Sequence, residues 1–221
     1  MTDPVELNDS PSPGESGGKP NLVGLGLALE LGLVILAIGL SYLGFYDHHQ
    51  KLAEITLAKL RMPAVIGLLG MIPLVFFMVS IDRIHWPMMR SLRAIADDLL
   101  YPLFKGLPLW QLLVIAIGAG VGEELLFRWC LQGGIRSLIE SQWLGISVSL
   151  IVASVVFGIC HWLNFTYFIF ALLVGIYFGA IMELTDSVVA PMITHALYDF
   201  VALVYIVHLR HPEDAAVSLD K

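Results

Sequence analysis

Six ionisable side chains lie inside apolar stretches of the second half of the sequence: Glu123, Glu124, Arg128, His161, His195 and Asp199. Glu124 and Arg128 are four residues apart, so on a helix they share a face and can form an ion pair. Glu123 points about 100° away around the same helix and meets no cation there. His195 and Asp199 also have the four-residue spacing, and the carboxylate can accept a hydrogen bond from the imidazole. Two histidines and an unpaired glutamate on three helices therefore indicate a functional site.

This combination of side chains suits the hydrolysis of an amide. A carboxylate can act as general base on a water molecule while a histidine holds that water. The second histidine can donate a hydrogen bond to the oxygen that gains charge in the tetrahedral intermediate. The same side chains, His161, His195 and Glu123, could instead bind a divalent metal such as zinc. The spacing does not decide between the two, because the sequence has no HExxH pair.

The composition places these side chains in a membrane protein. The chain is 57% hydrophobic and only 14% charged, and its mean hydropathy is +0.81. A soluble domain is about 45–50% apolar and about 25% charged. The net charge of −7 argues against a nucleic-acid partner, because no basic patch is present to neutralise phosphates. The bilayer is therefore the expected surrounding.

The hydropathy pattern predicts six membrane-spanning helices, because about 20 helical residues cross the hydrocarbon core. From Ser141 to Met182 there is no Asp, Glu, Lys or Arg, which is too long for one crossing, so we expect a break at His161–Asn164. Strand alternation is absent, and the predicted fold is an all-α, polytopic helical bundle. The predicted spans are Leu22–Tyr46, Pro63–Ile81, Leu107–Gly134, two within 141–182, and Val188–His208.

The remaining segments divide the chain. Residues 1–20 are acidic and rich in Pro, Gly and Ser, which predicts a disordered tail. Within 82–105 an apolar stripe recurs at helical spacing, and it predicts an amphipathic helix at the membrane interface; its members are Leu92, Ile95, Leu99 and Leu103. The expected organisation is a tail at 1–20, N-terminal spans and an amphipathic linker at 21–106, a catalytic membrane core at 107–209 and a C-terminal tail at 210–221.

Other polar positions have simpler interpretations. Cys130 and Cys160 form no metal-binding spacing and are expected to be buried thiols. Glu30 is the one charge of the first span, and the sequence assigns it no role.

The orientation in the membrane is indicated by the basic residues. Lys and Arg outside the spans number seven on the side that holds both termini and four on the other, which favours cytoplasmic termini.

The motifs resemble a known family. GEELLFR at 122–128 resembles the EExxxR motif of the CPBP (ABI) intramembrane endopeptidases, the family that contains the CAAX prenyl endoproteases. Phe157–His161 resembles its FxxxH motif, and His195–Asp199 its Hxxx(N/D) motif, within VAPMITHALYDF. The three motifs occur in order and cover roughly residues 108–205. The two N-terminal spans carry no motif of the family.

The resemblance implies proteolysis inside the membrane without a resident metal. Glu123 would be the general base, and His161 would help to activate the water. His195 and Asp199 would stabilise the oxyanion, with Glu124 and Arg128 as supporting residues. Asparagine is frequent where this chain has Asp199. Because an ionised aspartate cannot donate a hydrogen bond, Asp199 would either orient His195 or remain protonated.

Simple span boundaries give the site one geometric difficulty. They put Glu123 near the far end of its helix and His161 near the opposite membrane face. We therefore expect tilted, broken or displaced helices around a water-filled cavity.

Three functions follow from these observations. The first is an intramembrane endopeptidase in a prokaryotic cell membrane, acting on a membrane protein or peptide. The second is a non-catalytic membrane protein of the same fold that binds a peptide or confers bacteriocin immunity. The third is a proton-coupled transporter, which the absence of an inverted repeat disfavours.

Overall fold

The computed structural model describes residues 21–42 and 57–210, and this part of the chain is helical without a strand. Six of its helices are long and apolar enough to cross a membrane. The protein is an integral membrane protein, and the predicted all-α bundle is confirmed. The six candidate spans are Val23–Leu40, Lys59–Ile81, Leu109–Ser137, Gln142–Cys160, Phe165–Thr185 and Val189–Leu209. The predicted tail at 1–20 and all but Arg210 of the predicted tail at 210–221 lie outside the described residues.

The elements, in chain order, alternate long spans with short connections. Three of the elements named below, marked η, are π-helical. Their backbone N–H groups bond five residues back instead of four, so a turn contains about one residue more than in an α-helix. The elements are α1 (Leu22–Leu40), α3 (Leu57–Ile81), α4 (Pro87–Ile95), η2 (Ala96–Leu100), α5 (Tyr101–Phe104), α6 (Leu109–Glu124), η3 (Leu125–Gln132), α7 (Gly133–Ser137), α8 (Gln142–Cys160), α9 (Phe165–Thr185), α10 (Val189–Val204) and η4 (Tyr205–Leu209).

The long uncharged stretch breaks where the sequence predicts. Helix α8 ends at Cys160 and α9 begins at Phe165, so the connection is His161–Asn164. The Asn164 side chain accepts a hydrogen bond from the Tyr167 backbone N–H at 2.9 Å and thereby caps α9. At the other end of α9, Asp186 adopts the left-handed conformation, with a φ of 47°, which turns the chain into α10.

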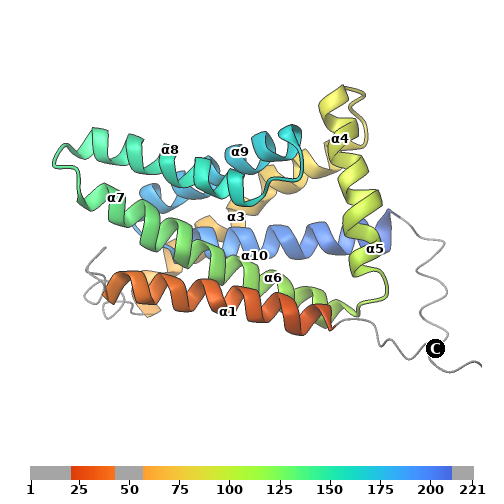
Figure 1. Cartoon of the computed structure of the whole chain (residues 1–221), viewed down its shortest axis with the longest axis horizontal. Helices are drawn as coiled ribbons and strands as arrows, with labels where there is room; N and C mark the ends of the chain where they lie inside the picture. The colour runs from red at the N-terminus through yellow and green to blue at the C-terminus, as the bar shows by residue number, and fades with distance from the viewer. Residues whose placement is uncertain (1–20, 43–56, 211–221) are drawn as a thin grey trace, which may run out of the picture.

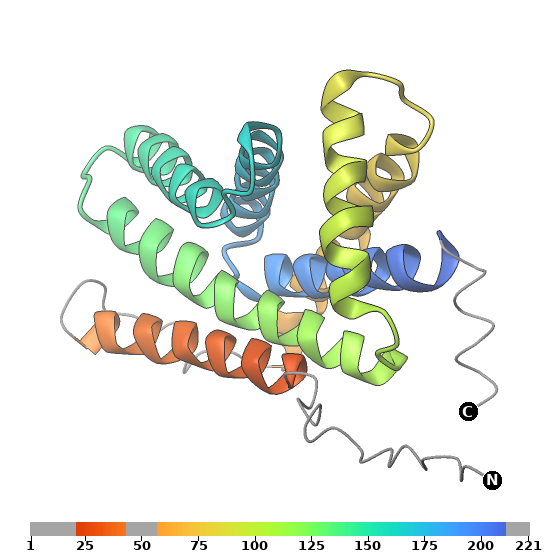
Figure 2. The same ribbon diagram turned by 45° about the vertical axis from the view of Figure 1, so that its right-hand side comes forward.

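Helix α10 lies at the centre of the bundle (Figures 1 and 2). It packs against α3 on one side and α6 on the other, while α1 covers α6 and η3 and α8 pairs with α9. The outer surface is apolar, with Leu29, Ile35 and Phe76 among its exposed side chains. The largest fully buried side chains include Arg128 and Gln132. This arrangement, apolar outside and polar inside, is the one that a bilayer favours.

Segment α4–η2–α5 runs across one end of the bundle (Figure 2). The predicted helix is present, but its predicted single apolar stripe is wrong. Leu92 is buried, whereas Leu99 and Leu103 are exposed. The physical reason is η2, whose wider turn shifts the phase of every side chain that follows it. The structure buries Ala96 and Tyr101 instead.

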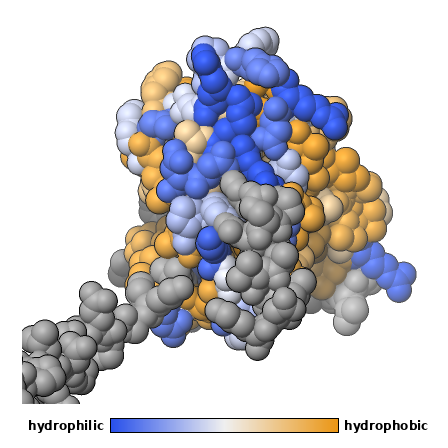
Figure 3. Space-filling model, turned by 90° about the vertical axis from the view of Figure 1, so that its right-hand side faces the viewer, coloured by the Kyte–Doolittle hydropathy of each residue, from blue (hydrophilic) through white to orange (hydrophobic). Residues whose placement is uncertain are grey.

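Polar contacts tie this crossing segment to the bundle. Arg93 donates to the backbone oxygens of Ile81 and Ile84. Arg210 pairs with Asp82 and Asp97 at 3.1 and 3.0 Å. Figure 3 views this end of the molecule and shows hydrophilic residues gathered over its upper part, with hydrophobic residues on both flanks. A polar end beside an apolar flank is consistent with a membrane–water boundary. The side of the membrane on which this end lies stays a prediction.

Candidate functional site

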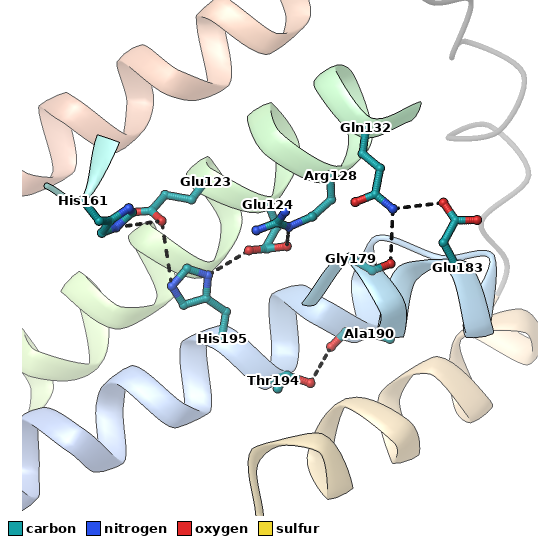
Figure 4. A network of polar contacts seen from close by, with 10 residues as sticks. All are labelled: Glu123, Glu124, Arg128, Gln132, His161, Gly179, Glu183, Ala190, Thr194 and His195. Carbon is teal, nitrogen blue, oxygen red and sulfur yellow. Dashed lines mark hydrogen bonds and ion pairs between the residues drawn. The ribbon is translucent and has the colours of Figure 1, made fainter. Parts of the chain in front are cut away.

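The site is assembled on one long helix. Helix α6 continues without interruption through η3 into α7, so Glu123, Glu124 and Arg128 lie on a single rod. Gly120 allows α10 to pack directly on this rod, because an added Cβ would lie 2.8 Å from the Ala196 backbone nitrogen. This close approach places His195 of α10 beside the two glutamates (Figure 4).

The predicted ion pair between Glu124 and Arg128 is confirmed. Arg128 Nε lies 3.1 Å from Glu124 Oε2, and neither side chain is exposed. The guanidinium carbon of Arg128 also lies 4.9 Å from the centre of the Phe157 ring, a cation–π arrangement. A buried charge needs such partners, since an isolated ion in a low-dielectric interior is strongly unfavourable.

Glu124 has a second partner that the sequence did not predict. Its Oε1 lies 3.0 Å from His195 Nδ1, so Glu124 connects Arg128 to the histidine (Figure 4). The His195 ring also stacks on Phe178 with 4.7 Å between the ring centres. Helical spacing reports only contacts within one helix, so this contact between α6 and α10 had no signal in the sequence. Glu124 therefore orients His195 as well as pairing with Arg128.

The Nε2 edge of the His195 ring is directed toward two more carboxylates. His195 Nε2 lies 3.3 Å from Asp199 Oδ2 and 4.0 Å from Glu123 Oε2. Because Glu124 is paired with a cation and accepts from Nδ1, the neutral ring has an unprotonated Nε2. At this distance a protonated Nε2 would donate a hydrogen bond to the Asp199 carboxylate. This geometry fits an Asp199 that orients His195.

Glu123 lies between the two histidines. Its Oε2 is 3.5 Å from His161 Nε2, and this oxygen is buried without a hydrogen-bond partner among the described residues. His161 Nδ1 lies 2.8 Å from the Phe157 backbone oxygen, so Nδ1 carries the proton in the neutral ring. His161 Nε2 is then an acceptor that faces the Glu123 carboxylate. Two such acceptors side by side suit the binding of a water molecule.

The structure removes the expected conflict of depth between Glu123 and His161. The span that holds Glu123 extends to Ser137 rather than Gly134, so Glu123 lies near its middle. Helix α8 is shorter, begins near Ser137 and runs back along the same rod (Figure 1). Its end therefore reaches the level of Glu123. The difficulty came from the predicted span boundaries, from which the helices are displaced as expected.

Exposure increases across the site in one direction. Glu124 and Arg128 are fully buried and His195 is 6% exposed, whereas the His161 and Asp199 side chains are 28% and 31% exposed. Asp199 also borders a cavity of about 260 Å³ between α3, the crossing segment, α9 and α10. Most of its lining is apolar, and its other polar members are Tyr167, Tyr198, Tyr205 and Arg210. The site is therefore exposed on the side of His161 and Asp199 and closed on the side of Arg128.

A metal site requires several ligand side chains that converge on one point. Among residues 21–42 and 57–210, no group of three His, Cys, Asp or Glu side chains is placed to hold a metal ion. Zinc needs ligand atoms at about 2.0–2.2 Å from a common centre. Glu123 Oε2 lies 3.5 and 4.0 Å from the two histidine Nε2 atoms, a spacing that also accommodates proton transfer through a water molecule.

The helical bundle and its buried polar centre define an integral membrane protein with a site inside the membrane. Residues 105–201 match the model of a protein family described as type II CAAX prenyl endopeptidase Rce1-like. This match confirms the resemblance that the three motifs predicted, and it supports a membrane protease similar to the CAAX proteases. Helix α1 and most of the segment before α6 lie outside it. No curated protein and no solved structure matches the chain.

Proposed function

We propose that the protein is an intramembrane endopeptidase in which Glu123 and His161 activate a water molecule for attack on a peptide bond. The observation that carries this proposal is the position of Glu123 Oε2, which is buried and faces the Nε2 atoms of both histidines at 3.5 and 4.0 Å. A structural carboxylate would instead be saturated with hydrogen bonds.

In the proposed reaction Glu123 first accepts a proton and later gives it back, while the other side chains hold the water or stabilise the charge. Glu123 takes a proton from the water as its oxygen bonds to the carbonyl carbon, and His161 Nε2 holds the water in place. His195, protonated at Nε2, donates a hydrogen bond to the oxyanion, which takes the place of Asp199 as the acceptor of that N–H. When the intermediate collapses, the C–N bond breaks and Glu123 returns its proton to the leaving amine. Glu124 and Arg128 hold His195 in position and take no part in proton transfer.

Cleavage by the purified protein tests this proposal. Wild type, Glu123→Gln and His161→Ala are treated with a chelator in detergent and incubated with a diverse peptide library, with products identified by mass spectrometry. The library includes a prenylated peptide with a CAAX end, because the matched family is named for that substrate. Glu183→Gln, which changes a carboxylate away from the histidines, is the matched control.

The expected result is chelator-resistant cleavage by wild type and Glu183→Gln. Glu123→Gln is expected to lose roughly 10³-fold or more of the rate, because a general base contributes about 10²–10⁴-fold. Cleavage that is lost to chelator and restored by zinc would replace the glutamate mechanism with a metal mechanism. If wild type binds peptides without cutting any of them, the non-catalytic peptide-binding function is the better explanation.

A further inference from the structure

The cavity beside Asp199 has no part in the proposed activation of water. Its volume is about 260 Å³, and it lies between α3, the crossing segment, α9 and α10. Asp199 lines this cavity, and the same carboxylate lies 3.3 Å from His195 Nε2. The cavity therefore adjoins the place where a peptide bond would be cleaved.

The walls of the cavity are mainly apolar. The crossing segment contributes Ile95 and Leu100, and α9 contributes Tyr167 and Phe170. Phe170 is held in place by stacking on Phe77 of α3, with 5.7 Å between the ring centres. Because a water molecule needs two to four polar partners, such walls favour an apolar occupant.

The two charged residues that line the cavity lie at opposite ends of it. Asp199 and Arg210 are about three helical turns apart along α10 and η4. Arg210 pairs with Asp82 and Asp97, and the Tyr205 hydroxyl donates to Asp82. An apolar group that enters beside Asp199 therefore meets paired charges at the far end, which limits its length.

The volume of the cavity also limits the occupant. Pockets for drug-sized ligands have volumes of roughly 300–1,000 Å³, and about 260 Å³ lies below this range. A space of this size suits one large apolar side chain better than a long lipid chain.

Most of the residues that line the cavity lie outside the region that matches the family. The match covers residues 105–201, whereas α3 ends at Ile81 and the crossing segment ends at Phe104. The matched region therefore contains every candidate catalytic residue but only part of the cavity wall.

We propose that this cavity is the specificity pocket of the endopeptidase and takes a large apolar side chain of the peptide, next to the bond that is cleaved. This inference rests on the proposed function. The peptide backbone passes beside Asp199, and the apolar side chain enters between the crossing segment, α9 and α10. Leu100 and the other wall residues of the crossing segment then determine which side chains fit.

Two opposite changes of the pocket test the proposal. The substrates derive from one peptide that wild type cleaves, with each residue beside the cleaved bond replaced in turn by Ala, Leu, Phe or Trp. Leu100→Ala enlarges the pocket and Ala202→Leu fills it, since both residues line the cavity. One methylene in an apolar pocket changes kcat/KM about 10–200-fold.

The two variants are expected to shift the preference in opposite directions. Leu100→Ala is expected to raise kcat/KM for the Trp peptide relative to the Leu peptide roughly 10-fold. Ala202→Leu is expected to lower kcat/KM for the Phe peptide relative to the Ala peptide roughly 10-fold or more. Each ratio is measured on one preparation, so it does not depend on the folded fraction, and either variant alone decides the question.

Leu99→Ala is the matched control. Leu99 is the neighbour of Leu100 on the crossing segment, but it is 43% exposed and does not line the cavity. This change is expected to leave the order of preference among the peptides as in wild type. An unchanged order in Leu100→Ala and Ala202→Leu would overturn the proposal, and so would an equal shift in Leu99→Ala and Leu100→Ala.

A prenylated peptide distinguishes a side chain from a lipid chain as the occupant. The same CAAX peptide is tested with and without its prenyl group. The pocket variants are expected to change the side-chain preference equally in both forms. If they change only the rate for the prenylated form, the pocket holds the lipid chain and the proposal is wrong.

Binding of fluorescein-labelled peptides needs no turnover. The peptides carry Phe or Ala at one central position, and fluorescence anisotropy with Glu123→Gln gives their Kd values. The Phe peptide is expected to bind roughly 10-fold more tightly, and adding Ala202→Leu is expected to remove the difference. Equal Kd values would contradict the pocket. If wild type cleaves no peptide, the proposed function fails, and these Kd values still decide whether the cavity takes an apolar side chain.

Discussion

The rod formed by α6, η3 and α7 contributes to two polar clusters whose glutamates, Glu183 and Glu123, differ in how fully they are bonded. At the α7 end, both oxygens of Glu183 are occupied: Gln132 donates at 3.0 Å and Arg136 at 2.6 Å. Around Glu123 the contacts are longer, at 3.5 and 4.0 Å, and one oxygen has no hydrogen-bond partner within the described part of the chain. The first cluster ties the rod to α9 in a fixed position. The second keeps bonding capacity for a molecule that is not part of the protein.

Glu124 separates these two behaviours, because it is saturated although it lies next to Glu123. It accepts from Arg128 and contacts His195, which makes it the fixed support of the reactive group. Of the two adjacent glutamates, Glu124 therefore contributes to stability and Glu123 is available for chemistry. Changes to the bonded residues and changes to Glu123 are therefore expected to affect the free energy of unfolding to different extents.

Arg128→Leu is expected to destabilise the protein most. It leaves the fully buried Glu124 carboxylate without its cation, and the loss of one partner of a buried pair costs about 3–5 kcal/mol. Thermal unfolding of the purified protein in detergent measures this. A variant as stable as wild type would show that Glu124 does not depend on Arg128.

Gly179→Ala attacks the bonded cluster through packing. The added Cβ would lie 2.4 Å from Leu150 Cδ1 and 2.6 Å from Gln132 Oε1, so side chains of two helices must move. Overpacking of this kind costs about 1–3 kcal/mol. The same thermal measurement applies, and Gly39→Ala, where an added Cβ meets nothing within 4 Å, is the control.

Glu183→Gln is expected to lower the free energy of unfolding by up to about 1 kcal/mol. The change removes a partly exposed ion pair with Arg136, and such pairs contribute about 0–1 kcal/mol. Cleavage activity is expected to be unchanged after correction for the folded fraction. A loss of kcat in this variant would join the two clusters functionally and contradict their separation.

Glu123→Gln is expected to change the unfolding free energy least, by less than about 0.5 kcal/mol. The reason is that Glu123 Oε2 makes no hydrogen bond that the change could break. Turnover is nevertheless expected to disappear. Unfolding curves and cleavage rates of the same preparation measure both effects. A large drop in stability would mean that Glu123 is a structural carboxylate like Glu183.

The sequence was sufficient for the parts of the structure that have a strong local signal. Hydropathy predicted the six spans and the break at His161–Asn164, because the length of a crossing is fixed by the bilayer. Spacing predicted the contacts of Glu124 with Arg128 and of His195 with Asp199, because residues four apart share a helical face. The three motifs predicted the family.

Contacts between helices could not be predicted in the same way. The link from Glu124 to His195 and the packing of Glu30 against α6 depend on Gly120 and Gly122, which set how closely α10 and α1 pack. One sequence does not show which helices are neighbours. The phase of Leu99 and Leu103 was also wrong, since nothing in ADDLL marks the π-helical segment η2.

The π-helical segment η3 has a consequence for the length of this part of the chain. It spans residues 125–132 and so lies between the glutamates and the second cluster. Deleting one residue between Cys130 and Gln132 would let this stretch relax into an ordinary α-helix. Because the deletion would remove the residue that the wider turn accommodates, Arg136 would keep its direction toward Glu183. If the stretch became α-helical with all its residues, everything after it would instead rotate by about 100° and turn Arg136 away from Glu183, while Glu123 and Glu124 kept their place. In η3, the number of residues matters as much as their identity.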